Sequence, residues 1–153
     1  MKTKHKIIVG IDPAFRQSGF AIAICDKTDK SCVFKVFENG FCDFVFWVLN
    51  DAPDIALWVV ENSNLQQSIW SGKSLKVAQS VGKNQAASQY TCDLLEVIYG
   101  KENVKGISPY QKGKKIKSDY FKTIVKALKY ELFNYKGNAQ DKRDAFMCAA
   151  KYL

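Results

Sequence analysis

Short continuous apolar runs and longer stretches with apolar residues three and four positions apart follow one another along the chain. Continuous runs indicate buried strands, and the wider spacing indicates helices with one buried face. We therefore expect strands at 6–12, 19–26, 31–37, 55–61 and 104–108, and helices at 40–50, 73–98, 118–133 and 139–152. A three-stranded antiparallel meander followed by strand–helix alternation predicts a single α/β domain over residues 1–153, with a five-stranded mixed sheet flanked by helices.

Two of these helices carry specific packing expectations. In the segment 73–98, apolar spacing predicts a buried face formed by Leu75, Ala78, Val81, Gly82, Ala86, Tyr90 and Leu94. Gly82 in that face predicts a closely packed neighbour, because glycine otherwise costs about 1 kcal/mol in a helix interior. The segment 40–50 is unusually apolar and fits either the core or a subunit interface.

Four carboxylates lie where these elements end or begin. Asp12 and Glu61 each end a predicted strand, at the edge where open α/β sheets hold their ligands. Asp141 and Asp144 follow Asn138, a good N-cap, on the inward stripe of the last helix. That stripe continues through residues 145, 148, 149 and 152. Crowded carboxylates repel one another, and a hard cation such as Mg²⁺ relieves the repulsion, so a metal site is predicted.

Each acid also has a purely structural explanation. Asp141 would interact favourably with the helix dipole, typically by about 0.3–1 kcal/mol. Asp12 precedes Pro13 and could begin a turn, and Glu61 could cap the segment after its strand. Asp144, one turn further along, has the weakest structural reason to be there. The charged residues Lys142, Arg143 and Lys151 fall outside the inward stripe and are expected in solvent.

The net charge of +8 is concentrated in one part of the chain. Residues 101–136 contain ten lysines against Glu102, Asp119 and Glu131, and ten minus three gives +7. Such a concentration suits a polyphosphate partner, because neutralising phosphates releases condensed counterions. A solvated lysine-rich face is the alternative. An acidic site within a basic chain favours nucleic acid as the partner.

Composition excludes several other chemistries and predicts a compartment. The five cysteines form no C-x-x-C pair, and His5 is the single histidine, so neither a zinc site nor a Cys/His nucleophile is supported. We expect the cysteines to be small core hydrophobes in a reducing compartment. The basic N-terminus leads into an apolar run too short for a signal peptide or a membrane span. A soluble, cytoplasmic protein without a membrane partner is the expectation.

An ordered set of motifs resembles the RuvC family of Holliday-junction resolvases over nearly the whole chain. Gly10-Ile11-Asp12-Pro13 and then Ser18-Gly19-Phe20-Ala21 are similar to the family's first hairpin, and Val60-Glu61 to its second acidic position. Residues 74–82 resemble the helix after that position, and Ser108-Pro109-Tyr110-Gln111-Lys112 with Gly113-Lys114-Lys115 the basic stretch after the fifth strand. Asp141-Lys142-Arg143-Asp144-Ala145 is similar to the closing D-x-x-D-A. Ala14 departs from the glycine usual after Asp-Pro.

The resemblance implies an RNase H-like fold and a homodimeric endonuclease that nicks two strands of a four-way DNA junction symmetrically. Two Mg²⁺ or Mn²⁺ ions would be held by Asp12, Glu61, Asp141 and Asp144. It further implies a bacterial protein, or a phage-encoded one acting in the host cytoplasm. It identifies no partner helicase.

Five other residues are candidates for DNA contacts. Lys112 is the first choice, and Lys117 the second, for a catalytic lysine that offsets charge on the scissile phosphate. Lys114 and Lys115 would contact flanking phosphates. The family's apolar wedge after the second acid is replaced by Asn62-Ser63-Asn64. Trp70 could instead stack on a base for about 1–3 kcal/mol, or could anchor a core or dimer contact.

Three alternatives remain open at this point. One is another nuclease of the same fold, acting on other branched DNA or on RNA–DNA hybrids. A second is a non-catalytic junction-binding protein, against which the four intact acids argue. A third is an actin-like or sugar-kinase ATPase, for which the chain is too short and lacks a glycine-rich phosphate loop.

Overall fold

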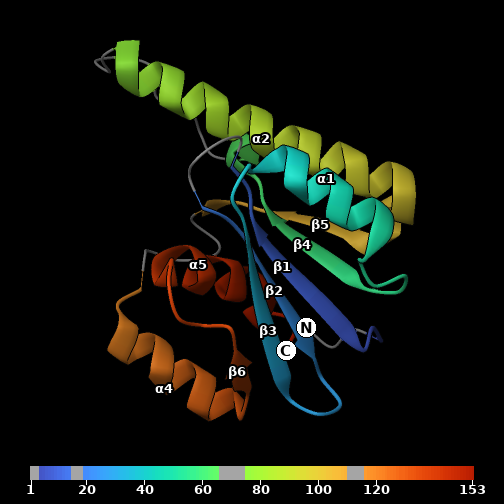
Figure 1. Cartoon of the computed structure of the whole chain (residues 1–153), viewed down its shortest axis with the longest axis vertical. Helices are drawn as coiled ribbons and strands as arrows, with labels where there is room; N and C mark the ends of the chain where they lie inside the picture. The colour runs from blue at the N-terminus through green and yellow to red at the C-terminus, as the bar shows by residue number, and fades with distance from the viewer. Residues whose placement is uncertain (1–3, 15–18, 66–74, 110–115) are drawn as a thin grey trace.

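The computed structural model describes residues 4–14, 19–65, 75–109 and 116–153, and shows an α/β fold built on one mixed sheet (Figure 1). The strands are β1 (Ile7–Asp12), β2 (Phe20–Asp26), β3 (Ser31–Phe37), β4 (Leu57–Glu61), β5 (Val104–Ile107) and β6 (Glu131–Phe133). The described α-helices are α1 (Phe41–Asn50), α2 (Leu75–Tyr99), α4 (Ser118–Leu128) and α5 (Ala139–Ala150), with short 3-10 turns η1 (Ser63–Leu65) and η2 (Lys101–Asn103). Among these helices, none is both long and apolar enough to cross a membrane.

The sheet has the strand order β5-β4-β1-β2-β3-β6. β1, β2 and β3 form the expected antiparallel meander, while β4 runs parallel to β1 and β5 parallel to β4. β6 adds a sixth strand, parallel to β3. The predicted mixed sheet is therefore confirmed, and its predicted number of five strands is wrong.

The extra strand comes from the segment predicted as one helix over 118–133. α4 ends at Leu128, because Lys129 adopts a left-handed backbone with φ 61° and its N–H bonds back to the carbonyl of Val125. Glu131 then pairs with β3, and its N–H donates to the carbonyl of Lys30 at 2.8 Å. A lysine in the left-handed region gives no sequence signal comparable to the glycine that commonly ends helices. For that reason the predicted helix over 118–133 extends beyond Leu128, where α4 ends.

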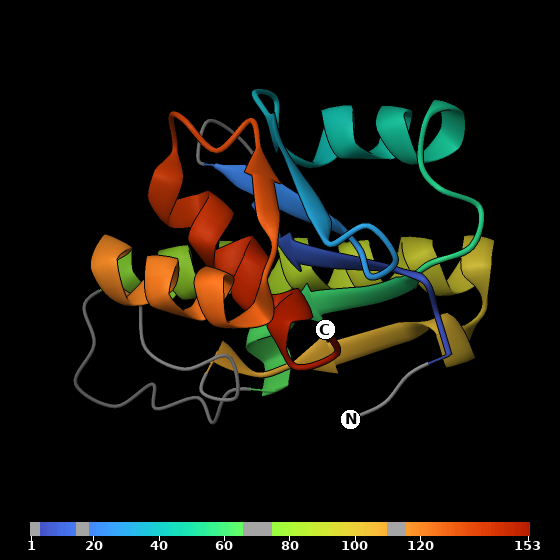
Figure 2. The same cartoon turned by 90° about the horizontal axis from the view of Figure 1, so that it is seen from below.

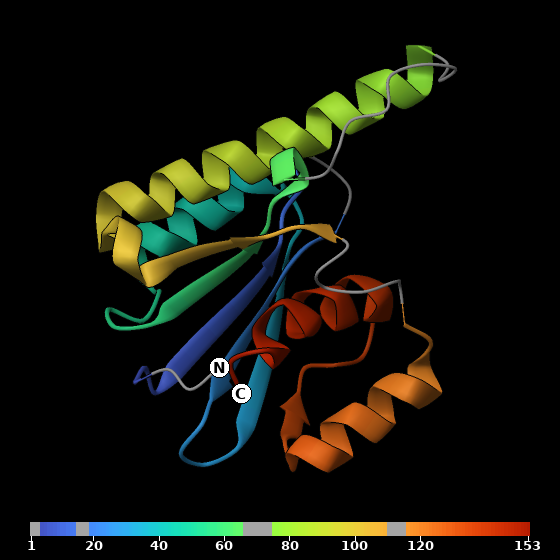
Figure 3. The same cartoon turned by 180° about the vertical axis from the view of Figure 1, so that it is seen from behind.

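Helices cover both faces of the sheet. α1 and α2 lie on one face, and α4 and α5 on the other (Figures 2 and 3). Side chains in β1 alternate between the two cores: Val9 and Ile11 pack with α1 and α2, whereas Ile8 packs with α4 and α5. The same alternation turns the side of Gly10 toward α5, where an added Cβ would overlap the carbonyl of Ala145. Glycine at this position lets the backbone of α5 lie directly against β1.

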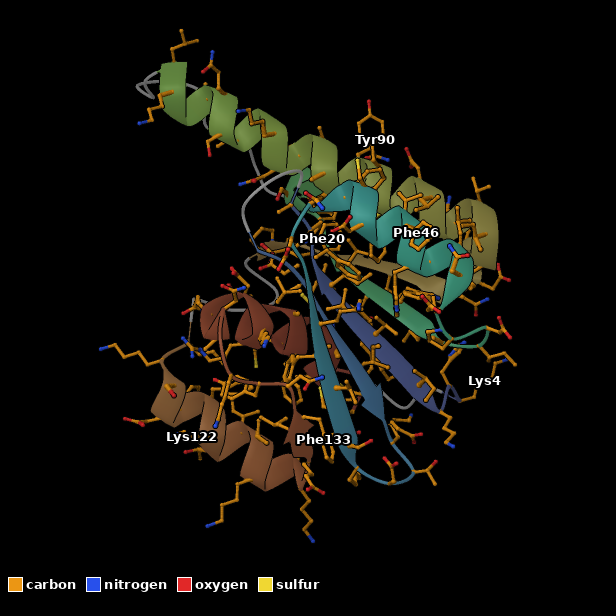
Figure 4. All side chains as sticks on the ribbon, in the orientation of Figure 1. Lys4, Phe20, Phe46, Tyr90, Lys122 and Phe133 are labelled. Carbon is orange, nitrogen blue, oxygen red and sulfur yellow. The ribbon has the colours of Figure 1, made fainter. Side chains whose placement is uncertain are left out.

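α2 packs through a different face from the one predicted. Among the side chains of α2 that the structure describes, the buried ones are Ala87, Ser88, Thr91, Cys92 and Leu95. Tyr90 is 55% exposed and lies on the outer side of α2 (Figure 4). An added Cβ at Gly82 would meet nothing within 4 Å, so the predicted close neighbour is wrong as well.

α1 contributes mainly to the core. Phe44, Trp47 and Val48 are buried, and the Phe44 ring stacks on Phe20 of β2 with centroids 4.6 Å apart. Phe46, however, is 68% exposed on the outer side of the helix (Figure 4). Of the two interpretations left open by the sequence, burial in the core accounts for the inner half of this helix.

α5 carries the predicted inward stripe, with one correction. Asp144, Ala145, Cys148, Ala149 and Tyr152 are buried as expected. Lys142, expected in solvent, is only 7% exposed, because its ammonium donates to the backbone carbonyls of Asn134 and Lys136. Arg143 is half-buried, whereas Lys151 is exposed as predicted.

The cysteines behave largely as small core residues. All five lie in the described part of the chain and carry free thiols. Cys42 is exposed, contrary to expectation, and the other four are buried. The Cys25 and Cys32 sulfurs are 3.2 Å apart between β2 and β3.

Candidate active site

Asp12 and Glu61 end neighbouring parallel strands at matching positions. The last paired residues of β1 and β4 are Ile11 and Val60, and each acid comes directly after one of them. Because side chains alternate along a strand, Asp12 shares the side of Gly10, and Glu61 shares the side of Val59. Both of these sides face α5. The two predicted strand-end acids are thus neighbours on one face of the sheet.

Asp141 reaches the same place from the first turn of α5. Its carboxylate lies against Gly19, which immediately precedes β2, and an added Cβ at Gly19 would overlap that carboxylate. The absence of a side chain at Gly19 therefore makes room for Asp141. The left-handed residue Asn138 occupies the N-cap as predicted, but it makes no side-chain cap hydrogen bond.

These three acids line one cleft of about 260 Å³. The described residues that line it are Asp12, Pro13, Ala14, Gly19, Glu61, Ser63, Asn84, Ser88 and Asp141. The acids come from β1, β4 and α5, which are far apart in the sequence. The structure thus brings together three of the four acids predicted to act jointly.

Asp144 is placed differently from the other three acids. It is 4% exposed and is not among the described residues that line the cleft. Its Oδ1 accepts a hydrogen bond of 3.1 Å from Nε2 of Gln140. It lies on the buried stripe of α5, one turn after Asp141, and does not line the cleft.

α2 fixes the backbone just after Glu61. The Ser88 hydroxyl donates to the carbonyl of Glu61 at 2.9 Å and accepts from the N–H of Ser63 at 3.3 Å. The Asn64 amide donates to the carbonyl of Gln85 at 2.9 Å. Ser88 and Asn84 were missed by sequence reasoning, which turned a different face of this helix inward. Their spacing of one helical turn was the available signal.

The donor atoms of the cleft suit a hard divalent cation. Carboxylate oxygens, with serine and asparagine oxygens beside them, are the ligands that Mg²⁺ and Mn²⁺ prefer. Within the described residues, however, no group of three or more His, Cys, Asp or Glu side chains is arranged to hold a metal ion. The kinds of donor atom present fit the predicted ions. For these side chains to bind an ion together, however, the carboxylates would have to turn toward one another.

Four of the five predicted DNA-contact residues lie outside the described part of the chain. Lys112, Lys114, Lys115 and Trp70 lie outside the described residues. Lys117 is exposed at the N-cap of α4 and is not among the described residues lining the cleft.

Other lysines of the basic region lie on α4 and just after it. Lys122, Lys126 and Lys129 are all exposed. Figure 4 places Lys122 on α4, on the opposite side of the sheet from Tyr90. This is the side of the sheet that carries α5 and its acids.

Comparison of the chain with models of protein families, with curated proteins and with solved structures finds no match.

Proposed function

We propose that this protein is a metal-dependent DNA endonuclease with an RNase H-like fold, which resolves four-way junctions by paired symmetric nicks. The observation that carries the proposal is the cleft in which Asp12, Glu61 and Asp141 meet. A pure binding protein would gain nothing from carboxylates that face phosphates. The motifs resemble those of RuvC-type resolvases, and for that reason we propose a four-way DNA junction as the substrate.

In the proposed reaction Asp12, Glu61, Asp141 and Asp144 would hold two Mg²⁺ or Mn²⁺ ions. When bound, such a pair activates the attacking water and stabilises the departing 3′ oxygen of an in-line displacement. Asp12 and Glu61 would contribute carboxylate ligands from the ends of two rigid strands. Asp141, whose carboxylate lies against Gly19, would contribute its ligand from α5. No covalent intermediate is required, in keeping with the lack of a Cys/His pair in the sequence.

The basic region would hold the DNA. Lys117, at the start of α4, and the predicted contacts Lys112, Lys114 and Lys115 precede an exposed lysine series on that helix. These ammonium groups would neutralise phosphates of the DNA. The described lysines of α4 lie on the side of the sheet that carries α5 (Figures 3 and 4). Two nicks at one junction require two active sites, so we propose that the working unit is a homodimer.

A labelled synthetic four-way junction tests the proposal. Wild type, incubated with Mg²⁺ or Mn²⁺, should make paired symmetric nicks, and Asp144→Asn should make none. Forks, RNA–DNA hybrids and linear duplexes serve as competitors. Equal cutting of the linear duplex would indicate a general nuclease, and tight junction binding without cleavage under either metal would indicate a binding protein on a nuclease fold.

A further inference from the structure

A chain of hydrogen bonds links the first turns of α5 to the segment that enters α4. The guanidinium of Arg143 donates from Nε to the carbonyl of Ile116 at 3.2 Å and from one terminal nitrogen to the Tyr135 hydroxyl at 3.2 Å. Its other terminal nitrogen donates to Oε1 of Gln140 at 3.0 Å. Gln140 Nε2 in turn donates to Oδ1 of Asp144 at 3.1 Å. Three elements therefore converge on one half-buried arginine.

The chemistry of arginine decides which way the Gln140 amide faces. A guanidinium has only donors, so the side of the amide that meets Arg143 must be its oxygen. The NH₂ group is then turned toward Asp144, where it can only donate. Reversing the amide would set two donors against each other at Arg143 and an oxygen against the Asp144 carboxylate. Arg143 thus fixes the hydrogen bond that Asp144 accepts.

The partners of Arg143 are themselves held in place. The Tyr135 ring stacks on Phe121 of α4, with centroids 5.4 Å apart and planes 23° apart. The neighbouring Lys142 holds the same loop through the carbonyls of Asn134 and Lys136. One terminal nitrogen of the guanidinium is therefore anchored to packed structure through Tyr135 while the other meets Gln140, a fork that an ammonium could not reproduce.

We propose that Gln140 and Arg143 are positioning residues that set the orientation of the Asp144 carboxylate for metal binding. This inference rests on the proposed metal-dependent function. Hydrogen bonds from outside the ligand set typically change metal affinity by about 10–100-fold when removed. Because Arg143 also bonds to Ile116, directly before Lys117, the same residue ties the proposed metal ligand to the basic segment.

The test uses three variants and a matched control, all in the full chain. Gln140→Met keeps the length and helix propensity of the side chain but removes the amide. Arg143→Leu removes the fork, and Arg143→Lys keeps the charge without it. Gln89→Met is the control, because Gln89 donates the same kind of amide hydrogen bond to a carboxylate one helical turn along, Asp93 on α2, at 2.7 Å, and is not among the described residues lining the cleft.

Two readouts separate this inference from the proposed function. The NMR signals of the Gln140 side-chain amide, recorded without metal, should shift in Arg143→Lys and stay in place in Gln89→Met. Calorimetric titration with Mn²⁺ should show about 10–100-fold weaker binding in Gln140→Met, Arg143→Leu and Arg143→Lys. Gln89→Met should bind Mn²⁺ like wild type.

Several results would overturn the inference alone. One is an unmoved Gln140 amide signal in Arg143→Lys, and another is wild-type Mn²⁺ affinity in Gln140→Met. A third is wild-type Mn²⁺ affinity in Arg143→Lys, because the positive charge alone would then be enough to position Asp144. A wild-type protein that binds no Mn²⁺ would instead overturn the proposed metal-dependent function, and the inference with it.

Discussion

Asp12 and Glu61 stand side by side at the ends of two parallel strands, each directly after the paired residues Ile11 and Val60. Neighbouring strands lie about 4.8 Å apart, so the two carboxylates belong to one small region of the sheet edge. Their carboxylate oxygens are ligands of the kind that a hard divalent cation prefers. The proposed metal site would use this pair, although ligation would require the carboxylates of the cleft to turn toward one another.

Gly19 should be required for activity rather than for folding. In Gly19→Ala the new methyl group would overlap the Asp141 carboxylate, which can swing aside because it ends a flexible side chain. We expect unfolding free energy to change by less than about 1 kcal/mol and junction cleavage to fall about 100-fold, as for small displacements of reacting groups.

Gly82→Ala is the control for that variant, because an added Cβ there meets nothing within 4 Å. It should stabilise α2 by about 0.5–1 kcal/mol and leave cleavage unchanged. Urea denaturation and initial cleavage rates measure the two effects. Wild-type cleavage by Gly19→Ala would show that the position of Asp141 does not matter.

Tyr130→Phe should raise stability. The Tyr130 hydroxyl is buried and has no hydrogen-bond partner among the described residues, a condition that costs about 1–3 kcal/mol. Phenylalanine would keep the ring beneath the Lys30 ammonium, 4.9 Å from its centroid, and omit the hydroxyl. We expect a gain of about 1 kcal/mol at pH 7 in urea denaturation.

The same variant carries a pH signature. Burial, aided by the nearby Cys25 and Cys32, raises the pKa of Tyr130 above its ordinary value of 10.0. Above pH 10 the unfolded chain therefore loses a proton that the folded protein retains, and wild-type stability falls as pH rises. The advantage of Tyr130→Phe over wild type should widen above pH 10. An advantage that is constant from pH 7 to 11 would contradict this account of the hydroxyl.

The exposed lysines of α4 should act on DNA affinity through salt. Lys122 and Lys126 lie one helical turn apart and are both exposed. If both neutralise phosphates, their double replacement by alanine should lower the slope of log affinity against log salt concentration by about 2. Fluorescence anisotropy with a labelled junction measures the slope. Lys35→Ala, on an exposed position of β3, is the control and should leave it unchanged. Equal slopes for the double variant and wild type would assign these lysines to solvation only.

Much of the sheet could be predicted because its strands are short apolar runs ended by charge or turn residues. β1, for example, ends at Asp12 as predicted. β6 could not be predicted, because three residues with an exposed first and last side chain are held by pairing with β3 and not by their own pattern. Lys129 likewise ends α4 through a left-handed backbone conformation that a lysine does not predict.

In the candidate site, too, residues marked by a local sequence pattern could be predicted, and residues held by contacts between distant segments could not. Strand ends at a sheet edge made Asp12 and Glu61 predictable, and helical spacing did the same for Asp141. The buried polar face of α2 was not predictable from hydrophobicity, because the Ser88 hydroxyl bonds to the carbonyl of Glu61 and the buried Thr91 hydroxyl to the carbonyl of Ala87 in its own helix. The network around Arg143 depends on contacts between distant segments, which spacing along one helix does not reveal.

We propose that the carboxylates of one cleft act together in metal-dependent cleavage of a four-way junction. The most direct measurement compares the Mn²⁺-dependent cleavage rates of wild type, Asp12→Asn, Glu61→Gln and Asp141→Asn. Asp119→Asn, an exposed acid on α4, serves as the control. We predict paired nicks from wild type and Asp119→Asn, and a loss of at least about 100-fold in each cleft variant, because removing a residue outside the ligand set already costs about 10–100-fold. Cleavage at the wild-type rate by any of the three cleft variants, or no junction cleavage by wild type, would contradict the account.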